Sequence, residues 1–478
     1  MKFEIKNIGL IDDATIEIAD ITCICGLNNT GKTYVTYAIY GFLAMFKELS
    51  HKVLTQRVMQ TKPKDGLIDL DDIFKGGTDS ILKDMSSIYV HYLSDVFGTK
   101  NLIKENSQFR AYMPNQDIDY LSCEMQRLVT PKSKNQDGSI NILKTPGSKY
   151  IEFIADASII ESFEIRRFAP FIVTFLHREV LEKITPKVYI ASAERTGAAI
   201  FRDELDFAKL RLFDILKNKQ DKKDISDALM NEAFGGNYSY AWPIEHNVDF
   251  VRKIETMYKD SGYFYEKHPE IIADFENIIG GSYKVIKNVL VYQSNSSGKQ
   301  KFAMSEASSS VRALLDIGFY IRCKLSPGDL LMIDEPELNL HPRNQRMLAR
   351  LLAKLVNHGV KVFLTTHSDF IIKEMNILIM LNNSKKNKIV AEKYKYSESE
   401  FLSSEQVSIY VTSKEKQSRK WINTLTKATI TKEFGVSLPT FDNSIEEMID
   451  IQSEPRQPGG CKLKTAPVRP VVAARPAE

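Results

Sequence analysis

Apolar and polar positions alternate along the first 25 residues, which predicts a series of short β-strands. Residues 2–6 and 14–18 alternate, and Gly9 allows a turn between them. Residues 21–25 are mostly apolar, as expected for a central strand that is buried on both faces. A glycine-rich loop follows, and the apolar residues within 34–43 indicate a helix after it. The chain is therefore predicted to open with three strands and a helix.

Later apolar runs predict that strands and helices continue to alternate, as in an α/β fold. Strands are expected at 187–191, 330–333 and 361–364, and helices at 308–324 and 343–357. Residues 282–304 are expected to form a hairpin with its turn at 295–298.

Three stretches carry a weaker pattern. Residues 45–185 contain helical segments, a polar loop at 130–147 and one strand candidate at 150–154. Residues 205–235 are helical in pattern and strongly charged, which is typical of a solvated tip or face. The Pro-, Ala- and Arg-rich segment 453–478 has no apolar period, so we expect a disordered tail. Its composition also fits a read-through tail foreign to the native domain.

Composition places the chain among ordinary soluble proteins, with 478 residues, 43% of them hydrophobic and 26% charged. The sequence shows no signal peptide and no apolar run of about 18 residues, so neither export nor a membrane association is expected. The net charge of +3 neither supports nor excludes a nucleic-acid partner. Five scattered cysteines do not form a disulfide framework, and Cys23 and Cys25 fit a buried strand better than a metal pair. We therefore expect a cytoplasmic protein.

The candidate chemistry begins in the loop after the third strand. Residues 26–33 read Gly-Leu-Asn-Asn-Thr-Gly-Lys-Thr, the phosphate-binding pattern of many nucleotide hydrolases. Glycines at both ends let the backbone wrap around phosphates, and the next helix presents its positive end to the anion. Lys32 is expected to reach the β- and γ-phosphates of ATP, and the Thr33 hydroxyl to coordinate Mg²⁺. The expected nucleotide-binding residues within the loop are Asn28, Asn29, Thr30, Gly31, Lys32 and Thr33. The alternative is a surface glycine loop without a ligand.

Two later strands end in residues suited to hydrolysis. Asp334 and Glu335 follow the apolar run 330–333, so Asp334 is expected to hold Mg²⁺ and Glu335 to accept a proton from the attacking water. As an alternative, this pair of carboxylates could cap a helix. His367 follows the run 361–364 and is expected to bond the γ-phosphate or that water. Its alternative is a solvent-facing position beside a helix start.

These motifs together resemble those of the ABC-type ATPase heads, which include SMC and double-strand-break-repair ATPases and ATPases related to overcoming-lysogenisation-defect (OLD) proteins. The resemblance identifies 26–33 as Walker A, 330–335 as Walker B, 337–342 as the D-loop and His367 as the switch histidine. It implies an α/β fold with a mixed sheet, N-terminal antiparallel strands and a mainly helical insertion. ATP and Mg²⁺ are the implied cofactors, and the implied reaction is ATP hydrolysis.

The resemblance also implies a signature segment that contacts ATP held by a second subunit. The corresponding residues are 304–312, in which Ser308 and Ser309 are expected to contact nucleotide. A hydroxyl-rich helix start suits an anion. The usual glycine pair is replaced by Ser309 and Ser310, which is a departure from the pattern and resembles the OLD-related proteins. A homodimer or higher homo-oligomer through the ATPase heads is implied.

The expected domain organisation interrupts one ATPase head with insertions. The expected segments are 1–44 (N-terminal part of the head), 45–185 (mainly helical insertion), 186–204 (return to the core), 205–280 (helical arm), 281–452 (C-terminal part of the head) and 453–478 (tail).

Motif spacing narrows the choice within the superfamily. About 270 residues separate Walker A from the signature segment, which is too many for a compact transporter ATPase, and long SMC-type heptad arms are missing from the sequence. Residues 192–197 resemble a motif of the OLD-related group. There, Arg195 could approach nucleotide or the neighbouring subunit, or form a structural salt bridge.

The resemblance to the OLD-related group implies a sensor or scaffold ATPase of a bacterial anti-phage defence system. Residues 385–452 lack the Glu-Gly strand start of the Toprim nuclease that OLD proteins carry. The effector, a nuclease or toxin, is therefore expected to be a separate protein, as in Septu-, retron- or PARIS-type systems, with DNA or a phage protein as the trigger. The alternatives are an SMC-like DNA-repair or chromosome-maintenance ATPase that acts directly on DNA, and a non-hydrolysing structural subunit.

Overall fold

The structure is a computed structural model that describes residues 1–436 with internal gaps, all within one compact unit. The gaps are residues 62, 65, 114–117, 130–139, 155–164, 201–239, 297, 383–384, 418–419 and 432–434. The expected charged helix at 205–235 and the tail at 453–478 therefore lie outside the described residues.

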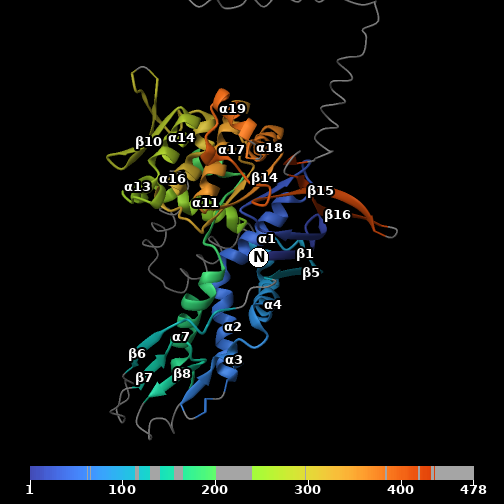
Figure 1. The fold of residues 1–478 in the computed structure, drawn as a ribbon, viewed down its shortest axis with the longest axis vertical. Coiled ribbons are helices and arrows are strands. Elements are labelled where there is room, and N and C mark those ends of the chain that lie inside the picture. The colour runs from blue at the N-terminus through green and yellow to red at the C-terminus, as the bar shows by residue number, and fades with distance from the viewer. Residues whose placement is uncertain are drawn as a thin grey trace, which may run out of the picture. The chain divides into compact units, whose positions relative to one another are not determined.

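A nine-stranded mixed sheet forms the centre of this unit (Figure 1). Its spatial order is β5 (Ile103–Tyr112), β1 (Lys2–Ile8), β2 (Ile11–Glu17), β16 (Lys420–Lys427), β15 (Val407–Gln417), β3 (Ile21–Cys25), β14 (Lys361–Thr366), β13 (Leu330–Asp334) and β9 (Val188–Ala191). The run from β15 to β9 is parallel throughout, while β1 is antiparallel to both of its neighbours, β5 and β2. This confirms the predicted mixed α/β sheet with N-terminal antiparallel strands.

The burial of each strand explains its sequence pattern. Every residue of β3 and β13 is buried, which accounts for their continuous apolar runs. Strands β1 and β2 alternate between buried and partly exposed positions because only one face is fully covered. Cys23 and Cys25 are buried free thiols of β3, as predicted.

Helices follow the strands of the main sheet that bear the predicted motifs. Helix α1 (Lys32–Ala44) continues from the loop after β3, and α17 (Pro342–Asn357) and α18 (Asp369–Leu381) follow β13 and β14. Ser368 caps α18, because its hydroxyl accepts hydrogen bonds from the backbone N–H groups of Phe370 and Ile371. The other helices of this part are α8 (Arg195–Ile200), α11 (Trp242–Arg252), α12 (Ile254–Met257), α13 (Tyr263–Lys267), α14 (Pro269–Ile279), α15 (Ser309–Ala313), α16 (Leu315–Cys323) and α19 (Lys385–Lys393).

The segment expected as a mainly helical insertion also contains sheet structure. Its helices are α2 (Phe46–Gln60), α3 (Leu70–Ile73), α4 (Gly77–Tyr89), α5 (Leu93–Val96) and α7 (Ile165–Leu176). They accompany a separate sheet in the order β4 (Leu67–Asp69), β8 (Tyr150–Ile154), β7 (Ile140–Lys144) and β6 (Met125–Val129). The expected strand at 150–154 is confirmed, whereas β7 lies where a polar loop was predicted.

The residues of strand β5 show why no strand was predicted in this part of the segment. It belongs to the main sheet and pairs with β1, although it lies in the middle of the expected insertion. Its first half is polar and exposed, and only Ser107, Phe109 and Ala111 are buried. Edge strands tolerate such polarity because one side of the strand faces solvent. The alternating apolar signal was therefore too short to predict the strand.

Aromatic side chains join β5 and β1 to the helices of the core. The ring of Phe42 lies 5.2 Å from that of Phe109 and 5.4 Å from that of Tyr89, and 6.1 Å from that of Phe3. The Tyr89 hydroxyl donates to the carbonyl oxygen of Ala38 in α1 at 2.7 Å. Each buried aromatic side chain contributes about 1.5–3 kcal/mol, so this cluster holds α1 and α4 firmly to the sheet.

The predicted hairpin at 282–304 is a three-stranded sheet. It comprises β10 (Gly281–Ile286), β11 (Val289–Ser294) and β12 (Lys301–Ala303). The first turn lies at Lys287 and Asn288, which both have positive φ angles, 53° and 62°. Such a two-residue turn matches the twist of antiparallel strands, but the Lys-Asn pair lacks the glycine that usually signals it. The turn expected at 295–298 falls between β11 and β12.

No helix among the described residues is long and apolar enough to cross a membrane.

Candidate nucleotide-binding site

Strand register brings the three predicted motifs to one edge of the main sheet. In the parallel pairing of β3 with β14, Cys25 is opposite Thr366. In that of β13 with β14, Asp334 is opposite Thr365. The phosphate loop, Glu335 and His367 therefore begin at the carboxyl ends of adjacent strands. Ligands of open α/β sheets bind at this edge.

The phosphate loop depends on glycine at both of its ends. Gly26 has a φ angle of 139°, and a Cβ there would lie 2.0 Å from the Thr412 hydroxyl oxygen of β15. Gly31 has a φ angle of 100°, and a Cβ there would lie 2.7 Å from Ile11 Cδ1. A side chain at either position would combine backbone strain with a steric clash. These contacts place the loop between β2 and β15.

Lys32, the first residue of α1, turns its amine into the phosphate loop. Its Nζ atom donates to the carbonyl oxygens of Leu27 at 2.8 Å and Gly26 at 3.2 Å. Burial lowers the Lys32 pKa below its usual value, although Glu335 and Asp334 oppose this shift. The Thr30 hydroxyl also donates to the Leu27 carbonyl, at 2.7 Å. A cation held inside the loop in this way suits an anionic ligand.

Glu335, His367 and Lys32 form a chain of polar contacts. The Nε2 atom of His367 lies 3.3 Å from Glu335 Oε1, and its Nδ1 atom lies 3.5 Å from Lys32 Nζ. Because the ammonium group can only donate, Nδ1 is the acceptor and Nε2–H faces the carboxylate. The pKa of Glu335 is lowered, first by this hydrogen bond from His367, so the carboxylate is available as a base. The structure thus brings these three predicted residues together.

Asp334 is buried beside this chain with one carboxylate oxygen unsatisfied. Its Oδ1 accepts a hydrogen bond from the Thr365 hydroxyl, whereas its Oδ2 has no hydrogen-bond partner. Burial raises the pKa of Asp334 to about 6. An orphaned carboxylate oxygen at 1% residue exposure is the environment that a hard cation would relieve. The residues present therefore fit Mg²⁺, which Asp334 and the Thr33 hydroxyl would hold.

Glu337 is a positioning residue that the sequence indicated only as part of the D-loop. Its Oε1 accepts a 2.6 Å hydrogen bond from the backbone N–H of His367. Its Oε2 is buried without a partner, and burial raises the pKa of its carboxyl group. Glu337 therefore fixes the backbone that carries the histidine. In the sequence, only its position three residues after Asp334 could have indicated this role.

Arg195 is buried beneath the site and contacts only backbone oxygens there. Its guanidinium donates to the carbonyl oxygens of Asp334 at 2.6 Å and Glu335 at 2.7 Å. It also donates to the carbonyls of Ala313 at 2.7 Å and Ser192 at 2.9 Å. Arg195 therefore joins Walker B to the end of α15 and to the segment after β9. Neither the predicted approach to nucleotide nor the predicted salt bridge describes these contacts.

The signature serines are exposed at the start of α15 and do not join the phosphate loop of the same chain through a described hydrogen bond. The Ser308 hydroxyl caps α15 by accepting from the Val311 backbone N–H, and lies 2.9 Å from the Ser310 hydroxyl. Ser309 is exposed in the first turn. Their nucleotide contact stays a prediction.

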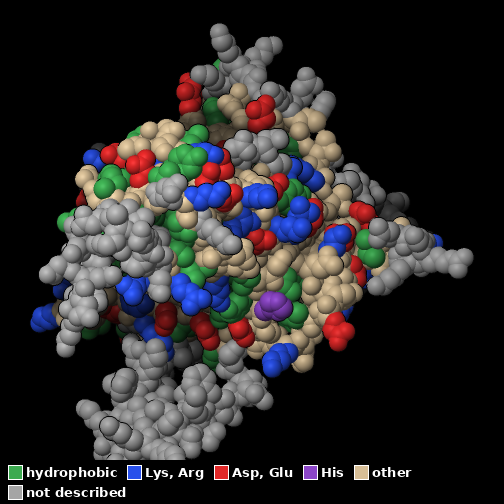
Figure 2. Space-filling view, turned by 90° about the horizontal axis from the view of Figure 1, so that it is seen from below, with side chains coloured by type: hydrophobic (Ala, Val, Ile, Leu, Met, Phe, Trp, Pro, Cys, Tyr) green, Lys and Arg blue, Asp and Glu red, His purple; other side chains and the backbone are tan. Residues whose placement is uncertain are grey.

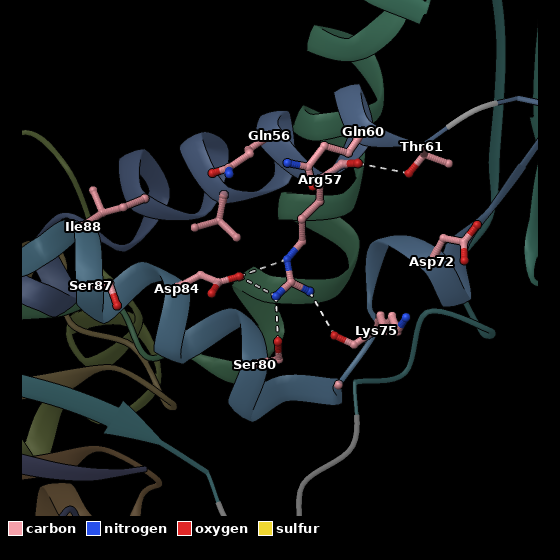
Figure 3. Close-up of a pocket in the computed structure, with 12 residues that line it drawn as sticks. Gln56, Arg57, Gln60, Thr61, Asp72, Lys75, Ser80, Asp84, Ser87 and Ile88 are labelled. Atoms are coloured by element: carbon pink, nitrogen blue, oxygen red, sulfur yellow. Dashed lines mark hydrogen bonds and ion pairs between the residues drawn. The ribbon is translucent and has the colours of Figure 1, made fainter.

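A separate polar cavity of about 850 Å³ lies between α2, α3 and α4 (Figure 3). Arg57 crosses it and donates to Asp84 at 2.5 Å, to Ser80 at 2.8 Å and to the Ile73 carbonyl at 2.9 Å. These contacts already use the guanidinium, so the cavity is a structural junction of the inserted segment. None of the predicted site residues lines it.

The sheet order, the phosphate loop and the carboxylates at its edge define the α/β fold of a P-loop ATPase domain. The chain belongs to the AAA ATPase domain family, which it matches over residues 1–372. No curated protein matches the chain.

The solved structures that are similar to the chain include two SMC heads. The SMC head domain from Thermotoga maritima is similar at 11% identity and a TM-score of 0.30, over 90% of this chain and 98% of that one. The Smc head of Pyrococcus furiosus with an extended coiled coil, bound to the C-terminal domain of ScpA, has 11% identity and a TM-score of 0.31, over 94% and 98%.

Proposed function

We propose that the chain binds and hydrolyses ATP at the edge formed by β3, β13 and β14. The observation that carries this proposal is the contact chain from Lys32 through His367 to Glu335, beside the orphaned oxygen of Asp334. A cation, a proton acceptor and a carboxylate oxygen that could bind a metal ion converge there. This is the set of groups that phosphoryl transfer to water requires.

Each group has a distinct part in the proposed reaction. Glu335 removes a proton from water as the water oxygen bonds to the γ-phosphorus and the bond to the β–γ bridging oxygen breaks. The electron pair stays on that bridging oxygen, giving ADP and phosphate, and Glu335 later releases its proton to solvent. Lys32 stabilises the charge that develops on the phosphate oxygens. Mg²⁺, when bound, neutralises charge on the same phosphates.

Paired variants test this assignment. Glu335→Gln should retain ATP binding and hydrolyse at least ~100-fold more slowly, because amide cannot accept the proton. Lys32→Ala should weaken ATP binding itself. Glu124→Gln, an exposed glutamate of the inserted segment, is the matched control and should behave as the parent. ATP turnover by Glu335→Gln at the parent's rate would show that hydrolysis does not use this site.

For the biological role, we propose that this ATPase is the sensor or scaffold subunit of a bacterial anti-phage defence system. It would control an effector on a separate protein, a nuclease or toxin. Strands β15 and β16 complete the main sheet between β3 and β2. The exposed Ser308 and Ser309 are available to complete a site on a second copy, as a homodimer through the heads would require.

Co-purification and DNA binding separate this role from direct action on DNA. The proposal predicts that the Glu335→Gln chain, in ATP, retains the product of a neighbouring gene on an affinity column, whereas Lys32→Ala does not. Saturable, strongly salt-dependent DNA binding without any protein partner would instead favour the SMC-like alternative. On the face shown in Figure 2, Lys and Arg side chains are interspersed with Asp and Glu, so charge of both signs is presented there.

A further inference from the structure

Two histidines and a glutamate meet where α14 begins and α17 ends, far along the chain from the phosphate loop. His268 immediately precedes α14, Glu270 lies in its first turn, and His358 follows the last residue of α17. One potential ligand atom from each of these three residues lies within 4.8 Å of the other two. Among the described residues, no other group of this kind was found.

Antiparallel packing of α14 on α17 brings these residues together. At one end of the pair, the Asn344 side chain donates to the Ile278 carbonyl at 2.9 Å. In the middle, Lys354 Nζ lies 2.5 Å from Asp274 Oδ2. The next contact along the pair is at His268 and His358, whose ring centroids are 4.1 Å apart. Figure 1 shows the two helices in the same region of the structure.

His358 is held in the tautomer that a metal ion needs. Its Nδ1 lies 2.7 Å from the carbonyl oxygen of Lys354. A carbonyl oxygen only accepts, so Nδ1 carries the hydrogen and Nε2 keeps its lone pair. Metal-binding histidines commonly direct their second nitrogen to a backbone carbonyl in this way, which fixes the ring and strengthens the ligand.

His268 and Glu270, the other two candidate ligands, already lie close to each other. The Nδ1 atom of His268 lies 3.1 Å from Glu270 Oε1. The buried Phe264 ring supports both histidine rings, at 5.8 Å from His268 and 6.3 Å from His358. Glu270 is 58% exposed, so an ion can enter from solvent and water can complete its coordination.

We propose that His268, Glu270 and His358 form a binding site for a divalent transition-metal ion, with Zn²⁺ the best match. Imidazole with one carboxylate is a typical zinc ligand set, and tetrahedral ligands about 2.1 Å from zinc lie about 3.4 Å apart. No two of the three ligand atoms are more than 4.8 Å apart, so side-chain rotation would bring them to this spacing. The cation would join the start of α14 to the turn between α17 and β14.

Metal titration of the full chain tests the site. The protein is stripped with chelator, kept free of nucleotide and held in excess Mg²⁺, so that carboxylate sites which prefer hard cations are occupied. Zn²⁺ binding is followed by calorimetry, and Co²⁺ binding by its visible spectrum. The parent is expected to bind one equivalent of Zn²⁺ and to give a tetrahedral Co²⁺ spectrum.

Matched variants decide the assignment. His268→Ala and His358→Ala should lower Zn²⁺ affinity at least tenfold, while His91→Ala, at an exposed histidine elsewhere, should not. Glu270→Gln removes an exposed ligand without disturbing packing. Its lower affinity for Zn²⁺ therefore tests the site even if a histidine variant fails to fold. Zn²⁺ should raise the melting temperature of the parent and of His91→Ala, but not that of Glu270→Gln. Equal Zn²⁺ binding by the parent and all three site variants, or none by the parent, would overturn the proposal.

Discussion

The Nε2 atom of His367 lies 3.3 Å from Oε1 of Glu335, so the histidine at the end of β14 orients the proposed base at the end of β13. The same ring contacts Lys32 through Nδ1 at 3.5 Å. One imidazole thus links the phosphate loop to the carboxylate, and its two nitrogens have opposite roles.

His367→Ala should therefore slow hydrolysis more than it weakens ATP binding. Loss of the hydrogen bond leaves Glu335 poorly oriented, and we expect kcat to fall ~10- to 100-fold with a smaller change in KM. Steady-state kinetics measure this difference. His91→Ala serves as the histidine control, because His91 is exposed and lies in the inserted segment. An unchanged kcat in His367→Ala would remove the histidine from the mechanism.

Asp334→Asn should stabilise the metal-free chain at neutral pH. Burial raises the pKa of Asp334 to about 6 from a usual 3.8, so the folded state binds this proton more tightly than the unfolded state does. The associated stability is present below pH 3.8 and is lost as pH rises through about 6. Asparagine carries no charge, and the gain at pH 7.5 should be on the order of 2–3 kcal/mol.

Urea unfolding of parent and Asp334→Asn, in EDTA and across pH, measures this effect. The difference in unfolding free energy should shrink as pH falls toward 4. Saturating Mg²⁺ and ATP should stabilise the parent and not the variant. A difference that is independent of pH would show that the Asp334 carboxyl is not the titrating group.

Arg195→Lys should destabilise the chain even though it preserves charge. A lysine cannot replace a planar guanidinium that donates to four carbonyl oxygens from three segments. Buried carbonyls left without donors should lower the unfolding free energy by about 3 kcal/mol or more. Denaturant unfolding measures this, with the exposed Arg178→Lys as the control. A loss below ~0.5 kcal/mol would contradict the inferred role.

Gly26→Ala should abolish nucleotide binding. Adding Thr412→Ala to that variant should partly restore its stability. The new Cβ would meet the Thr412 hydroxyl oxygen at 2.0 Å, and the second change removes that atom. The strain of a φ angle of 139° would remain. Melting temperatures of the two single variants and the double variant give the coupling. Strictly additive effects would show that the two residues are not in contact.

Much of the site could be predicted because its residues lie next to clear local signals. Asp334, Glu335 and His367 each follow an apolar run, and parallel strands with helical crossovers place such ends together. The phosphate loop has a specific spacing of glycines and lysine. Local sequence was therefore sufficient for these positions, and the fold confirms their proximity.

Other features depended on contacts that no short sequence window contains. Arg195 receives most of its role from carbonyl groups on two distant segments, at Ala313 and at Asp334–Glu335, so its neighbours in the sequence did not indicate it. Strand β5 showed little alternation because half of it is solvated at the sheet edge. The pairing of β15 with β3 joins residues almost 400 positions apart, and β-pairing at such separation leaves no local signature.

The placement of β15 between β3 and β16 has a consequence for how the protein is made. During synthesis, the phosphate loop emerges early, whereas β15, whose Thr412 lies beside Gly26, emerges almost 400 residues later. Until then, β3 presents an unpaired edge to solvent, which invites association with other chains. A nascent or prematurely ended chain therefore lacks a finished nucleotide cradle. ATP-binding competence would report that translation had passed residue 417.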